Sequence, residues 1–134
     1  FLSVSLPVAA SRVLADASRG AVESYASVEE CMAGLKERAA TEDRRYKEIY
    51  GIEYFNYSNY NLVLDSSDCA PEILAKILVE EAKAAEERLA KGEPLGSKLI
   101  LCKDRPAEDF AKEKAEGTVS TQTLCGVEFT VIEL

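Results

Sequence analysis

The sequence predicts an α/β fold, and three observations carry that prediction. Hydrophobic residues make up 47% and charged residues 30% of the 134 positions, a composition typical of globular domains. The segment Leu62-Val63-Leu64 is apolar without alternation, which is typical of a parallel strand covered on both faces. This segment lies between two long stretches of helical periodicity, 27–50 and 71–91. We therefore expect a parallel sheet with flanking helices.

The N-terminal third predicts a strand and two helices. Residues 1–6 alternate between apolar and small polar side chains, as a strand does. Residues 7–17 are rich in Ala, Val and Leu and carry a proline in the first turn, which is typical of a helix. Ser27 and Glu30 have the capping-box spacing that satisfies free amide groups at a helix start. A long helix is predicted from there over 27–50.

The middle of the chain predicts a strand followed by a second long helix. Gly51 ends the first long helix, because glycine accepts the left-handed conformation of a C-terminal cap. Aromatic and asparagine residues over 54–59 predict a loop before the strand 60–65. The helix 71–91 begins with proline and ends before Gly92.

The C-terminal part differs in composition and is predicted to be a separate extension. A turn begins it, and three elements follow: a strand over 98–102, a short acidic helix over 106–116 and an alternating strand over 127–134. We expect a main domain over residues 1–92 and a small β-α-β extension over 93–134, to which the sequence assigns no role.

Composition excludes several classes of function. The net charge of −8 argues against a general surface for nucleic acid or anionic lipid. The absence of histidine excludes catalytic triads, Cys-His dyads and histidine metal sites. No run approaches the ~20 apolar residues of a membrane span. The four cysteines form no Cys-x-x-Cys pair, so we expect reduced thiols, no metal site and a cytoplasmic location.

Arg38, Glu42 and Arg45 form the charged group with the clearest chemistry. Steps of four and three residues place them within about 60° of one another on the first long helix. Two guanidinium groups at this spacing can converge on a phosphate, and a carboxylate between them can hold both in place. An ordinary solvated salt-bridge face has the same spacing, so the spacing leaves both interpretations open.

The sequence around this group closely resembles the C-terminal half of cytidylate kinases, above all the archaeal-type members. In that family an Arg-Tyr-Lys-x-x-Tyr-Gly-Ile-Asp segment precedes a Tyr-Asp-Leu-Val-Ile-Asp-Thr-Ser strand. The resemblance covers roughly Phe1 to Leu78. Its motifs are the helix end 42–53, the strand and turn 58–67, the helix start Pro71-Glu72, and the strand and arginine helix 2–12.

The resemblance implies roles for five charged residues. Arg38, Glu42 and Arg45 match the family's substrate-binding pattern position by position, which implies contacts with the CMP nucleotide and its phosphate. Arg12 matches an arginine at the start of the family's lid, and Arg19 lies within the lid. Both are implied to be catalytic, in keeping with phosphoryl transfer, which relies on positioned cations rather than on an imidazole base.

The resemblance also implies ATP and Mg²⁺ as cofactors, with Asp65 and Ser66 near the donor nucleotide. A helix-entry turn explains Asp65 and Ser66 equally well. The chain contains no Gly-x-x-x-x-Gly-Lys-Ser/Thr loop, which holds the ATP phosphates in P-loop kinases. We therefore expect part of a P-loop-type sheet, from a protein that continues before Phe1.

We expect the chain to be part of a nucleoside monophosphate kinase that transfers the γ-phosphoryl group of ATP to CMP or dCMP. Its partner is then a small nucleotide, with no nucleic acid or membrane, and we expect a monomer. Two alternatives stay open. One is a non-catalytic remnant that binds a nucleotide or another protein, and the other is a kinase of the same fold with a different small-molecule acceptor.

Overall fold

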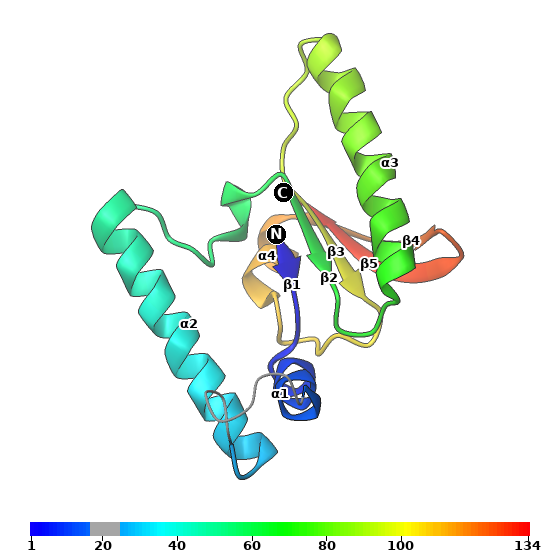
Figure 1. Ribbon diagram of the computed structural model, residues 1–134. Coiled ribbons are helices and arrows are strands. Elements are labelled where there is room, and N and C mark those ends of the chain that lie inside the picture. Colours follow the sequence, from blue (N-terminus) through cyan, green and yellow to red (C-terminus); the bar gives the residue numbers. More distant parts are fainter. Residues whose placement is uncertain (17–24) are drawn as a thin grey trace. The chain divides into compact units, whose positions relative to one another are not determined.

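The computed structural model describes residues 1–16 and 25–134 (Figure 1). The chain divides into two compact units. The sheet unit comprises Phe1–Ser3 and Tyr57–Leu134, and the helical unit comprises Val4–Asn56. Each unit has its own buried core, so each is described by itself.

The helical unit is built from α1 (Leu6–Ala15) and α2 (Val28–Tyr50). The two helices pack through a small core in which Ala10 and Cys31 are fully buried. Small side chains at these positions let the two backbones approach closely. The helix predicted over 7–17 is confirmed in its described part, although it begins one residue earlier and ends at Ala15.

Both ends of α2 agree with the sequence-based prediction. The Ser27 hydroxyl accepts a hydrogen bond from the amide of Glu30 at 3.1 Å, and the Glu30 carboxylate accepts one from the amide of Ala26 at 2.9 Å. Gly51 adopts the left-handed conformation with φ 69°, and its amide donates to the carbonyl of Lys47. Side-chain capping and a glycine stop therefore define this helix.

The sheet unit contains a five-stranded sheet in the order β1-β2-β3-β5-β4. Two flanking helices and a short 3₁₀ turn, η2, complete it. The elements are β1 (Leu2–Ser3), η2 (Tyr57–Asn59), β2 (Leu62–Asp65), α3 (Pro71–Ala90), β3 (Lys98–Cys102), α4 (Ala111–Glu116), β4 (Thr118–Leu124) and β5 (Val127–Glu133).

The first three strands of the sheet are parallel and the last two are antiparallel. Leu2 lies opposite Leu64 on the neighbouring parallel strand, and Leu64 lies opposite Ile100 in turn. β5 runs antiparallel to both β3 and β4. The carboxyl ends of β1, β2 and β3 consequently meet at one edge of the sheet, where α/β folds commonly bind ligands.

Hydrophobic side chains cover both faces of the central strands, which confirms the prediction from Leu62-Val63-Leu64. On one face Val63 packs with Leu99, Leu101, Phe110 and Ile132. On the other face Leu64 packs with Ile100, Phe129, Val131 and Ile77 of α3, which lies across that face (Figure 1).

The C-terminal residues do not follow the predicted β-α-β pattern of a separate extension. β3 lies between β2 and β5 in the middle of the sheet, so the sheet continues across the expected boundary at residue 92. A further strand, β4, follows the short helix. The sequence does not predict β4, because its Thr, Ser and Gln residues show no apolar alternation. The strand forms because β5 supplies its hydrogen-bond partners.

The predicted helix 106–116 is shorter in the structure. Regular α4 begins only at Ala111, because Phe110 adopts a left-handed conformation with φ 63°. This conformation accompanies the burial of the Phe110 ring in the core, where it lies 4.9 Å from the ring of Tyr57. Tertiary packing therefore interrupts a segment whose local sequence favours a helix.

Charged residues recur along both long helices, α2 and α3. Within the part of the chain that the structure describes, no helix combines the length and the apolar character needed to cross a lipid bilayer.

Candidate functional site

Asp65 lies at the carboxyl end of β2 and is completely buried. One of its carboxylate oxygens accepts hydrogen bonds from the amide of Ser67 at 3.0 Å and from the Ser67 hydroxyl at 2.6 Å. The other oxygen accepts one from the amide of Cys102 at 3.0 Å. A buried carboxylate needs such donors, because its removal from water is otherwise costly.

Arg105 supplies the positive charge that balances Asp65. Its Nη1 lies 2.9 Å from the Asp65 carboxylate, and its Nε lies 2.8 Å from the carboxylate of Asp109. The same Nη1 reaches the hydroxyl of Ser3 at 3.3 Å. The guanidinium carbon lies 5.0 Å from the centre of the Phe110 ring.

We call Ser3, Asp65, Ser67, Arg105 and Asp109 the carboxyl-edge cluster. It joins the ends of β1 and β2 to the segment that follows β3. Its two carboxylates outnumber its one guanidinium, so it is not a site built to attract an anion. Its hydrogen bonds fix the three strand ends relative to one another.

Asp65 and Ser66, the residues expected near ATP, already use their side chains in hydrogen bonds within the protein. Asp65 already accepts hydrogen bonds on both carboxylate oxygens. Ser66 is half-buried, and its hydroxyl donates to the carbonyl of Ser3 at 3.0 Å. Asp65 and Ser66 thus lie where β2 ends and a turn begins, whereas α3 starts only at Pro71 with Ala70 as its N-cap. A contact with a donor nucleotide stays a prediction.

Arg105 is not among the site residues that the sequence predicts. Lys98, Lys103 and Arg105 are too few to predict a binding patch. The sequence feature that indicates such a residue is Asp65, because a carboxylate at the end of a strand covered on both faces needs a cation from elsewhere in the chain. The sequence does not show which cation has the right position; the register of β2 and β3 decides it.

The thiol of Cys102 is also part of this strand edge. Burial raises the pKa of Cys102 to about 11, and the negative charge of Asp65 acts in the same direction. The amide of Asp68, 3.4 Å from the sulfur, opposes this effect.

We expect the Cys102 thiol to resist alkylation in the folded protein. With a pKa of about 11, roughly one thiol in a thousand is ionised at pH 8, and the thiolate is the reacting form. Cys125 is exposed and should react first. Peptide mass spectrometry after timed iodoacetamide treatment measures both rates, with the urea-unfolded protein as control. Equal rates for Cys102 and Cys125 in the folded protein would contradict the expectation.

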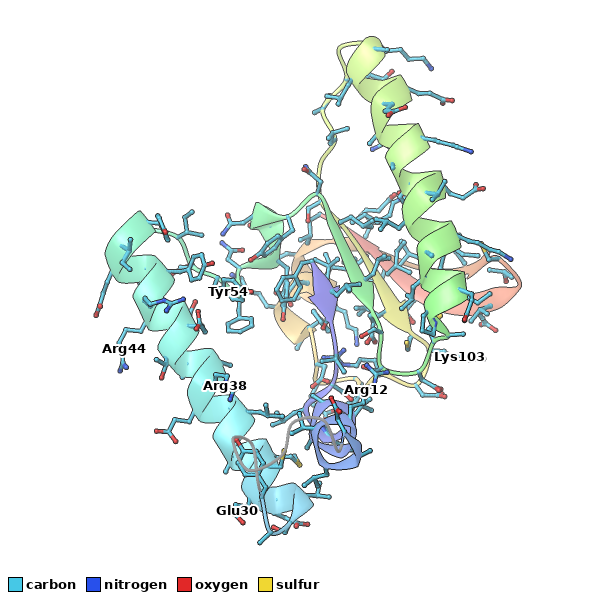
Figure 2. All side chains as sticks on the ribbon, viewed as in Figure 1. Arg12, Glu30, Arg38, Arg44, Tyr54 and Lys103 are labelled. Carbon is cyan, nitrogen blue, oxygen red and sulfur yellow. The ribbon has the colours of Figure 1, made fainter. Side chains whose placement is uncertain are left out.

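The expected substrate-binding residues Arg38, Glu42 and Arg45 lie on α2 in the helical unit. Arg45 forms an ion pair with Glu42 at 3.0 Å, in which the two side chains are 60% and 39% exposed. Figure 2 shows Arg38 and Arg44 on different sides of α2. The Arg45–Glu42 pair belongs to the expected salt-bridge face, and the side chains of Arg38 and Arg45 are both exposed.

Of the two expected catalytic arginines, Arg12 lies on α1, the helix that packs against α2 (Figure 2). Its side chain is exposed. Arg19 lies outside the described residues. The helical unit therefore holds Arg12, Arg38, Glu42 and Arg45, whereas Asp65 and Ser66 belong to the sheet unit.

Comparison with known proteins gives one partial similarity. A stretch of 77 residues is 39% identical to a protein from Methanopyrus kandleri named cytidylate kinase. The stretch represents 58% of this chain and 38% of the Methanopyrus protein, so the chain spans well under half the length of that relative. No protein-family model and no solved structure matches the chain. This similarity points to a relationship with the nucleoside monophosphate kinases.

Proposed function

We propose that this chain is the acceptor-binding part of a nucleoside monophosphate kinase that transfers the γ-phosphoryl group of ATP to CMP or dCMP. The observation that carries the proposal is the 77-residue similarity to the Methanopyrus cytidylate kinase. The exposed arginines of the helical unit support it, because a monophosphate is a dianion that guanidinium groups bind through two parallel hydrogen bonds.

In this proposal the residues of α1 and α2 bind and orient the acceptor. Arg38 and Arg45 bind the monophosphate, and Glu42 holds Arg45 in place through the ion pair already formed. Arg12 adds positive charge from the neighbouring helix, where it offsets the charge that builds up during phosphoryl transfer. The reaction needs no imidazole, in keeping with a sequence that has no histidine.

The described residues do not fit the ATP phosphates or Mg²⁺. The sequence has no glycine-rich loop with the Lys-Ser/Thr end, and both oxygens of Asp65 already accept hydrogen bonds. Within residues 1–16 and 25–134, no three potential ligands among Cys, Asp and Glu gather closely enough to hold a metal ion. We therefore assign only acceptor binding to this chain.

The alternative is a module that binds a nucleotide without catalysing its phosphorylation. Two measurements separate the possibilities. Calorimetric titration of this chain with CMP, dCMP, UMP and AMP tests acceptor binding, and we expect CMP and dCMP to bind most tightly. A coupled assay of ADP formation with the complete product of the gene tests catalysis.

Binding of CMP without ADP formation would favour the non-catalytic module. Equal binding of all four nucleotides, or no binding of CMP, would contradict the cytidylate assignment. Turnover of a different acceptor would instead indicate another small-molecule kinase of the same fold.

A further inference from the structure

The sheet unit contains a cavity of about 230 Å³ at the edge opposite the carboxyl-edge cluster. Asn61 and Lys98, which border the amino ends of β2 and β3, form one side of it. The second half of α3 forms another side. Figure 1 shows α3 extending beyond the strands, with the segment 91–97 returning beside it to β3. Leu95 of that segment completes the wall.

The cavity exists because α3 carries small side chains where it leaves the sheet. Ala82 and Ala85 lie on the face of α3 that lines the cavity, in line with Leu78 one turn earlier. Alanine fills little of the space between the helix and the returning segment. The result is an apolar wall with a few polar groups around it, as in many small-molecule sites.

Positive charges outnumber negative charges around the cavity. Lys98 and Glu81 form an ion pair at 3.2 Å with side chains 25% and 23% exposed, so their charges offset each other. Arg88 donates from Nη1 to the carbonyl of Leu95 at 3.2 Å and forms no ion pair with any carboxylate in the described part of the chain. The cavity thus carries about one positive charge on a protein whose net charge is −8.

We propose that this cavity binds a small organic carboxylate with one apolar ring or short chain. The Arg88 guanidinium has the planar donor geometry that matches a carboxylate, and its hydrogen bond to the Leu95 carbonyl holds it beside the cavity. A cavity of about 150 Å³ can hold a benzene ring, so 230 Å³ leaves room for a ring with a short arm. The Glu81 carboxylate in the wall disfavours a ligand of higher negative charge.

The test uses 3-phenylpropionate as the probe, titrated into the ¹⁵N-labelled chain and followed by NMR. We expect shifts of the Leu95, Lys98 and Ala85 amides, with a Kd on the order of 1 mM for so small a ligand. The neutral 3-phenylpropionamide and the cationic 3-phenylpropylamine, which share the ring, should bind at least about tenfold more weakly, because a charge-assisted contact is lost.

Two variants tie the binding to the cavity. Arg88→Gln should weaken 3-phenylpropionate binding about tenfold and leave the affinity for the neutral 3-phenylpropionamide unchanged. Arg44→Gln, on α2, is the matched control. Ala85→Leu should abolish binding by filling the cavity, whereas Ala75→Leu, at an exposed position of the same helix, should not. The two controls make the same kinds of substitution outside the cavity, so a loss of binding that they do not share can be assigned to the cavity itself.

Three results would overturn the proposal. They are equal binding of the acid, the amide and the amine, shifts confined to residues outside the cavity, and unchanged binding in Ala85→Leu. None of these measurements involves nucleotides or phosphoryl transfer. The inference and the proposed function can therefore fail separately.

Discussion

Replacement of Arg105 by alanine lowers the free energy of unfolding of the sheet unit by about 3 to 5 kcal/mol, because it leaves Asp65 as a buried carboxylate without its cation. The remaining hydrogen bonds from Ser67 and Cys102 orient that carboxylate but carry no opposing charge. A loss of this size is a large fraction of the total stability of a small domain.

Urea denaturation measures the loss, with hydrogen exchange of the β2 and β3 amides to assign it to the sheet unit. Lys103→Ala is the matched control, because Lys103 pairs with Glu128 on the surface with side chains 64% and 46% exposed. That variant should lose less than about 1 kcal/mol. A change of similar size in both variants would show that Arg105 does not balance a buried charge.

A double-mutant cycle separates the ion pair from other effects. Asp65→Asn with Arg105→Ala should cost clearly less than the sum of the two single substitutions, because the buried charge disappears together with its partner. Additive losses would mean that the two residues act independently. The packing of Arg105 against Phe110 would then explain the loss from the arginine alone.

Replacement of Arg45 or Arg38 by alanine raises the Kd for CMP about tenfold or more if α2 binds the monophosphate. A hydrogen bond to a charged group contributes about 1.5 to 3 kcal/mol, and each arginine can make such a bond to the phosphate. Calorimetry with CMP measures this directly. The affinity should also fall as the salt concentration rises, because the interaction is between charges.

The stability of the same variants distinguishes phosphate binding from a surface salt bridge. The Arg45–Glu42 pair is exposed, so its loss should change the free energy of unfolding by less than about 1 kcal/mol. Arg44→Ala, on another side of α2, should leave CMP affinity unchanged. Unchanged affinity in both Arg38→Ala and Arg45→Ala would leave the group as an ordinary salt-bridge face.

Local sequence was sufficient to predict the long helices α2 and α3 and the buried strand β2. The Ser27 cap and the Gly51 stop act through hydrogen bonds to neighbouring residues, so their effect can be read within a few positions. The continuous apolar run at Val63 and Leu64 likewise predicts burial on both faces. The spacing of Arg38, Glu42 and Arg45 on one helix follows from the same periodicity.

Tertiary structure decided the features that depend on residues far apart in the chain. β4 forms because β5 offers it hydrogen-bond partners, and Phe110 leaves the helical conformation when its ring enters the core. Arg105 reaches Asp65 across 40 positions of sequence, through the parallel register of β2 and β3.

By itself the sequence determined the α/β class, the two ends of α2 and the charged face of that helix, because each rests on periodicity or on contacts between near neighbours. Only the tertiary structure decided that residues 93–134 complete the same sheet, that Arg105 balances Asp65, and that Arg88 lies beside an apolar cavity. The physical reason is that buried charges and cavities depend on which distant segments meet, and strand pairing fixes that choice.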